Sequence, residues 1–257
     1  VMFKNDWILL GVFMDISVIV NQVVILFLII IVGFYARKRN IITADTTGKL
    51  STLLLQITMP MLIFSSFDFE VSEEMLRNAL LVLVLSFLIH FFSMLIAKFL
   101  YVSYQASTRN ILKFVTVFSN CAFMGFPVLY SVFGSKGVFY GALYGIPFNI
   151  LALSYGVMIF TGKNDKDTLR KIIIHPVNLS VVAGMVFFLL KIQLPKPVSE
   201  AVAMTGSMTS PLSMVIVGAL LADVPIRGLL RGSEIYIGST VRLIVIPLIV
   251  YGLLSLL

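Results

Sequence analysis

The middle of one apolar segment reads Ser119-Asn120-Cys121-Ala122-Phe123-Met124-Gly125-Phe126-Pro127. Apolar residues continue on both sides of it, from Ile111 to Val117 and from Val128 to Phe133. Proline lacks the N–H that a helix interior needs, and glycine leaves helical geometry at little cost. Unpaired backbone groups are costly in hydrocarbon, so such a break persists only inside protein or beside a water-filled cavity. The stretch therefore predicts a broken helix at membrane depth, which is typical of secondary transporters.

The composition is that of an integral membrane protein with several spans. Apolar residues make up 59% of the 257-residue chain and charged residues only 12%, unlike a soluble domain. The single cysteine, Cys121, excludes a disulfide within the chain. The net charge of +7 does not indicate nucleic acid, because the basic residues lie in short connections between spans. No metal cluster, P-loop, nucleophile elbow or redox motif is present in the sequence, so we expect no cofactor, no metal and no enzymatic activity.

Eight segments are apolar enough to be drawn as spans: Ile16–Ala36, Leu50–Phe67, Leu76–Tyr101, Ile111–Phe133, Val138–Thr161, Ile174–Leu190, Val198–Leu221 and Ile235–Leu257. Basic residues gather after the odd-numbered spans, and acidic residues such as Asp68, Glu70 and Glu73 after the even-numbered ones. Because cytoplasmic loops are rich in Lys and Arg, we expect a multi-pass protein of the plasma membrane (the inner membrane in a bacterium) with its N-terminus outside. Residues 1–13 are expected to form an N-terminal extension.

An internal repeat organises the chain. Gly33 and Gly184 each lie late in a span, and the same 151 residues that separate them also separate Thr58-Met59-Pro60 from Thr209-Ser210-Pro211. With this offset, span one corresponds to span six, so the repeat unit holds five spans. Because five is an odd number, the second copy enters the membrane from the opposite side and is inverted. We therefore expect an all-α membrane protein with a first five-helix repeat over residues 14–161 and an incomplete second repeat of three helices over residues 162–257.

The order of motifs resembles the auxin efflux carrier family, which includes plant PIN-type auxin carriers and bacterial malonate or malate permeases. The pattern Asn-x-x-x-x-Gly-x-Pro at Asn120, Gly125 and Pro127 resembles the fourth helix of that family. Further matches lie in the first, second, sixth and seventh spans, at Gly33 to Lys38, at Pro60, Leu62 and Phe64, at His175-Pro176, and at Pro211-Leu212, Gly218, Leu220 and Ala222.

The resemblance implies a ten-helix fold of two inverted five-helix repeats. In this fold helices four and nine are broken and cross at their prolines, an architecture shared with the bile acid–sodium symporters and NhaA-type antiporters. The offset of 151 residues places the partners of Asn120 and Pro127 beyond Leu257. Eight spans of an expected ten are therefore present, and helices nine and ten are expected to be missing.

Asn120 is the strongest candidate for substrate contact. Its amide offers two donors and an acceptor at a depth where polar groups are costly, which suits a carboxylate or a carbonyl ligand. The alternative is that Asn120 only caps backbone groups freed by Pro127. In the first interpretation Gly125 and Pro127 belong to the substrate site because they open the helix.

Three further residues are candidates for the lining of the site. Asn149 would contact substrate or make an interhelical hydrogen bond. Met59 and Ile63, beside Pro60, would form an apolar wall or ordinary packing. His90 either serves proton coupling or is a satisfied bundle histidine, and Arg242 is expected to snorkel near the cytoplasmic end of span eight.

These observations favour a secondary transporter of small organic anions such as auxin-like or dicarboxylic acids. Coupling to H⁺ or Na⁺ is open, as is a homodimer. The alternatives are a sodium-coupled, bile-acid-type symporter of bulkier anions and a membrane sensor or partner subunit without transport. An intramembrane enzyme is the weakest alternative, because no span carries a catalytic Asp pair, a His-Glu metal set or a Ser-His pairing.

Overall fold

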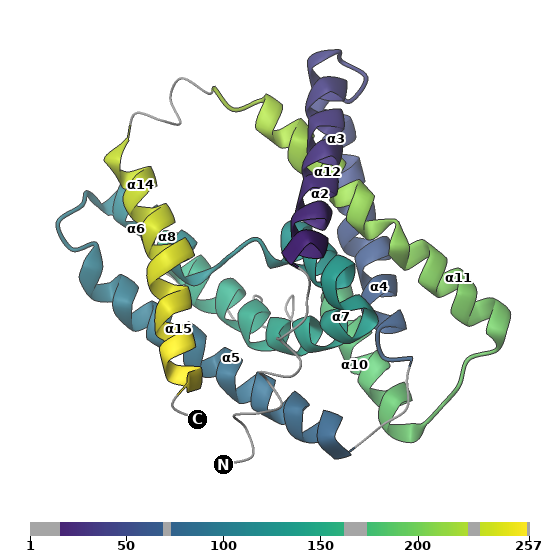
Figure 1. Ribbon diagram of the computed structural model, residues 1–257. Helices are drawn as coiled ribbons and strands as arrows, with labels where there is room; N and C mark the ends of the chain where they lie inside the picture. The colour runs from purple at the N-terminus through teal and green to yellow at the C-terminus, as the bar shows by residue number, and fades with distance from the viewer. Residues whose placement is uncertain (1–15, 69–72, 162–173, 226–231, 256–257) are drawn as a thin grey trace.

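The computed structural model describes residues 16–68, 73–161, 174–225 and 232–255, and every regular element in these ranges is helical (Figure 1). The predicted N-terminal extension and Glu70 lie outside the described residues. The α-helices are α2 (Ile16–Lys38), α3 (Ala44–Leu53), α4 (Met59–Ser65), α5 (Glu73–Leu100), α6 (Ala106–Val117), α7 (Phe126–Leu151), α8 (Val157–Thr161), α10 (Pro176–Leu190), α11 (Lys196–Ser207), α12 (Thr209–Ala222), α14 (Ser233–Thr240) and α15 (Ile246–Ser255).

Four short π-helical segments connect these helices within the described ranges. They are η1 (Leu54–Thr58), η2 (Cys121–Gly125), η3 (Ala152–Gly156) and η4 (Val241–Val245). A π-turn holds one residue more than an α-turn and frequently lies at a functional site. Two of the four, η2 and η4, lie beside the helix break that is described below.

Six helical stretches of the described residues are long and apolar enough to cross a membrane: Val20–Lys38, Ala44–Ser65, Glu73–Leu100, Phe123–Thr161, Lys196–Ala222 and Ser233–Gly252. The stretch Pro176–Leu190 is a shorter apolar helix. The predicted fourth span, Ile111–Phe133, is a broken helix: α6 has only 12 residues, about 18 Å at 1.5 Å per residue against a hydrocarbon core of about 30 Å, and η2 with the first residues of α7 supplies the rest. The residues after the break continue into span five through a bend at Gly134, whose φ of 62° favours glycine.

The closest helix pair is α2 with α12, which lie side by side in Figure 1. A Cβ atom at Gly33 would overlap the backbone of Val215, and one at Gly218 would overlap the backbone of Ile30. Small residues at such contacts let membrane helices approach until their backbones touch. The opposite face of α2 exposes large apolar side chains such as Phe27, which is 62% accessible and suited to lipid.

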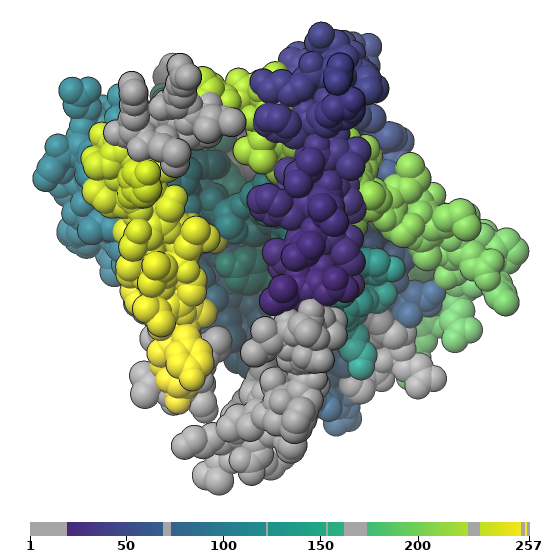
Figure 2. All heavy atoms as spheres, turned by 45° about the horizontal axis from the view of Figure 1, so that its top comes forward, coloured from purple at the N-terminus to yellow at the C-terminus, as the bar shows by residue number. Residues whose placement is uncertain are grey.

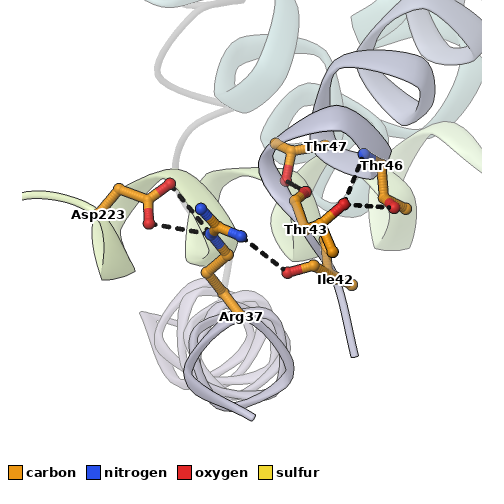
Figure 3. Close-up of polar contacts among 6 residues, drawn as sticks. All are labelled: Arg37, Ile42, Thr43, Thr46, Thr47 and Asp223. Carbon is orange, nitrogen blue, oxygen red and sulfur yellow. Dashed lines mark hydrogen bonds and ion pairs between the residues drawn. The ribbon is translucent and has the colours of Figure 1, made fainter. Parts of the chain in front are cut away.

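Three polar contacts connect segments that follow spans of like parity. Arg37, at the end of α2, donates through Nε to both carboxylate oxygens of Asp223, at 2.9 and 3.1 Å, and through Nη1 to the carbonyl of Ile42 at 3.2 Å (Figure 3). Ser199 Oγ donates to Asp68 Oδ2 at 2.8 Å, and Asn110 Nδ2 donates to the carbonyl of Ile159 at 2.8 Å. The first and third contacts lie where odd spans end, and the second lies where even spans end and the next span begins, as an alternating path through a membrane requires.

Candidate functional site

The predicted break lies where α6 ends. Phe118 is extended, with φ −110° and ψ 118°, and the helix resumes only with η2 after Asn120. The N–H groups of Met124 and Gly125 donate to the carbonyl of Asn120 at 3.3 and 3.1 Å, which closes the π-turn. Regular structure is therefore absent from residues 118–120. Figure 1 shows this connection as a thin teal trace that crosses between the α14 side and the α2 side of the molecule.

Gly125 and Pro127 predict that helical bonding lapses between Cys121 and Pro127, whereas the break in the structure lies upstream of these residues, at 118–120. Gly125 has helical angles, with φ −63° and ψ −55°, so the chain does not leave the helix there. Pro127 follows η2 without a gap, since the N–H of Phe126 donates to the carbonyl of Cys121. The second half-helix therefore begins at Cys121, Pro127 lies inside it, and the gap lies upstream of both. Gly125 and Pro127 support the break, and Asn120 lies in it.

Asn120 uses its two amide atoms differently. Its Oδ1 accepts from the N–H of Phe123 at 3.1 Å and so caps the π-turn. Its Nδ2 donates to no residue that the structure describes, and the side chain is exposed. Figure 2 shows the surface hollowed between the purple α2 and the yellow α14–α15, with teal residues from the middle of the chain at the bottom. Capping therefore leaves a donor available to a ligand.

Arg242 binds the C-terminal end of α6, on the opposite side of the break from η2. Its Nη1 donates to the carbonyls of Thr116 and Val117 at 2.9 and 3.4 Å. These are among the last carbonyls of α6, which carry the negative end of the helix dipole and lack helical N–H partners. The expectation that Arg242 snorkels near the end of its span is wrong: it is the tenth of the 20 residues in the apolar stretch Ser233–Gly252. The arginine therefore lies at the middle of its span.

A buried histidine, His90, packs beside the break. His90 in α5 is 1% exposed, and its Nδ1 donates to the carbonyl of Ser86 at 2.6 Å. Ser86 Oγ donates to the carbonyl of Tyr144 at 2.8 Å, which ties α5 to α7. The ring of His90 packs against Tyr144 and Phe118, with centroids 5.3 and 6.3 Å apart. Its Nε2 is buried without a partner among the described residues.

The other predicted residues lie elsewhere. Asn149 Nδ2 donates to Asn178 Oδ1 in α10 at 2.8 Å, which is the interhelical hydrogen bond considered as its alternative. Met59 and Ile63 are fully buried in the core around α4 and line no accessible surface in this conformation. Sequence reasoning placed Arg242 wrongly, although an arginine inside an apolar stretch is itself a functional signal.

The apolar helices and the broken fourth helix define a multi-pass integral membrane protein of the transporter class. The chain belongs to the membrane transport protein family, also known as the auxin efflux carrier family, whose model matches residues 18–257. It is 24% identical over 247 residues to an uncharacterized transporter of Methanocaldococcus jannaschii, a match that covers 92% of this chain and 79% of that protein. The resemblance predicted from the motifs is confirmed.

Proposed function

We propose that this transporter is a secondary carrier of small organic anions, such as auxin-like or dicarboxylic acids, and that it binds them at the break between α6 and η2. The observation that carries the proposal is the Nδ2 of the exposed residue Asn120, a donor without a described partner at the point where an apolar helix is interrupted. An amide donor suits a carboxylate oxygen. Polar groups at membrane depth are costly, which favours a functional reason for this one.

We infer that the fold is an inverted repeat. Under the offset of 151 residues, Gly33 corresponds to Gly184 and Phe67 to Gly218. Gly33 and Gly218 lie in the contact of α2 with α12, and a Cβ at Gly184 would overlap the ring of Phe67 in the contact of α10 with α4. The two contacts exchange under the offset, which is what a two-fold relation between repeats requires. This supports the predicted repeats over residues 14–161 and 162–257.

We propose the same orientation that the charges predict, with the N-terminus outside and the Arg37–Asp223 pair at the cytoplasmic face. Lys38 and Arg39 lie beside that pair at the end of α2. In this orientation the C-terminal end of α6 and the start of α7 meet within the membrane, and substrate reaches them from the hollow between α2 and α14–α15. Transport would be driven by a gradient of H⁺ or Na⁺.

The test is uptake of labelled indole-3-acetate, malonate and malate by the full chain in liposomes. We expect saturable uptake of at least one acid, and a loss of about tenfold or more in its affinity in Asn120→Asp, which keeps the capping oxygen and removes the amide donor. Asn40→Asp, the same substitution at an exposed turn beyond α2, is the matched control and should transport normally. Absence of uptake of all three acids would contradict the function, and normal affinity in Asn120→Asp would move the site elsewhere.

A further inference from the structure

We propose that Arg242 binds the carboxylate of the substrate and makes the site selective for anions. The inference rests on the proposed function and adds the residue that recognises the negative charge of the substrate. It begins with the place of Arg242, at the middle of an apolar stretch of 20 residues. An arginine there disfavours membrane insertion, and such residues mark substrate or ion pathways.

The charge of Arg242 has no acidic partner among the described residues. The ion pairs shown among the described residues are Arg37–Asp223, Lys49–Asp45 and Lys196–Glu200, and none of them includes Arg242. Its interactions are the two hydrogen bonds to the carbonyls of Thr116 and Val117. These acceptors carry only partial negative charge, so a carboxylate beside the guanidinium would add the full counter-charge that its described contacts do not supply.

The guanidinium also keeps donors for a ligand. Both hydrogen bonds use Nη1, whereas Nε and Nη2 donate to no residue that the structure describes. The side chain is half-buried, and neither of these nitrogens is a buried atom without a partner. Nε and Nη2 form the edge of the planar fork that pairs with both oxygens of a carboxylate.

The geometry of the break explains why a positive charge is needed there. The C-terminal end of a half-helix presents carbonyl oxygens and a negative dipole, so the end of α6 would by itself repel an anion and attract a cation. Arg242 occupies this cation position with a charge fixed to the chain. Asn120 lies three residues beyond Val117 along the chain. A carboxylate in the gap would accept from the guanidinium at one end and from the Asn120 amide at the other.

The test compares acids with neutral amides of the same shape on the full purified chain. Binding of indole-3-acetate is measured against indole-3-acetamide, and malonate against malonamide. The wild type should prefer the acid by about tenfold or more. Arg242→Gln keeps N–H donors for the carbonyls of Thr116 and Val117 but removes the charge. It should lose the preference through weaker acid binding, with amide binding changed by less than about twofold. Arg39→Gln, at an exposed arginine beyond α2, is the matched control.

Each outcome separates the two proposals. If the wild type binds no acid, the proposed function fails and this inference fails with it. If it binds acid and amide equally, or if Arg242→Gln weakens both equally, transport stands and Arg242 is only a helix cap. Arg242→Lys decides the question if the glutamine variant does not accumulate. Retained preference for the acid in a folded lysine variant supports charge recognition, and an equal loss of acid and amide binding in that variant overturns it.

Discussion

Gly33 lies so close to Val215 that a Cβ atom at position 33 would overlap the carbonyl group of Val215. Gly218 meets the backbone of Ile30 in the same way, so α2 and α12 touch along their backbones at two levels. Interdigitated contacts of this kind are not continuously deformable, because packed interiors have almost no free volume. We expect α2 and α12 to move as one body in any transport cycle.

Gly33→Ala should therefore destabilise the protein by about 1–3 kcal/mol, the usual cost of overpacking, and toward the upper end because the obstacle is backbone. Gly145→Ala is the matched control, since a Cβ at that position in α7 meets no atom within 4 Å apart from its chain neighbours and the backbone of its own helix. The measurement is thermal unfolding of both variants in detergent. Equal stability of the two variants would contradict the close contact.

The ion pair between Arg37 and Asp223 predicts an asymmetry between its two partners. The Asp223 side chain is 51% exposed, so Asp223→Ala should cost no more than about 1 kcal/mol. The Arg37 side chain is 18% exposed and also holds the carbonyl of Ile42, so Arg37→Ala should cost more. Unfolding of the single and double variants measures both costs and their coupling. A smaller loss in Arg37→Ala than in Asp223→Ala would contradict the interpretation.

The hydrogen bond from Asn149 to Asn178 predicts a structural effect. Asn149→Ala should lower stability by about 0.6 kcal/mol, the average for hydrogen bonds between membrane helices. Acid affinity should change far less than in Asn120→Asp, because the Asn149 amide is held by Asn178 of α10. Unfolding and acid binding are measured on the same preparation. A fall in affinity comparable to that of Asn120→Asp would show that Asn149 lines the site, as the sequence predicted.

Orientation is tested with single cysteines in a Cys121→Ser background. A cysteine at Arg39, beyond α2, should react with an impermeant maleimide only after the membrane is opened. A cysteine at Asp68, beyond α4, should react in intact cells. Lys166, a natural position for the same test after span five, lies outside the described residues. The reverse labelling pattern would invert the proposed topology.

Local signals predicted most of the fold. Apolar length located the spans, and the predicted bounds of the first span, Ile16–Ala36, agree within two residues with α2. The break was also visible, because proline and glycine act on their own neighbours along the chain. Its place was wrong because η2 carries the helix through Gly125 to Pro127 as a π-turn, and a proline in the sequence does not say whether a widened turn accommodates it.

The contacts of the site could not be predicted in the same way. Arg242 binds carbonyls of residues that lie 126 and 125 positions earlier. The acceptors are backbone atoms, which every residue carries, so no pattern of side chains marks them. Asn149 and Met59 show the opposite difficulty, because polarity or a nearby proline does not say whether a side chain faces a neighbouring helix or an open space.

The π-helical segments make the effect of a change in residue count depend on where in a helix it falls. An α-helix turns by about 100° per residue, so a residue lost from its interior rotates everything downstream by that angle. Such a loss early in α12 would turn Gly218 away from Ile30 and bring a larger side chain against α2. A residue lost from η1 or η4 instead leaves an ordinary α-turn, because a π-turn holds one residue more, and the helix on either side keeps its face. In this protein a single-codon deletion therefore redirects a helix when it falls in an α-helical turn and is absorbed when it falls in a π-turn.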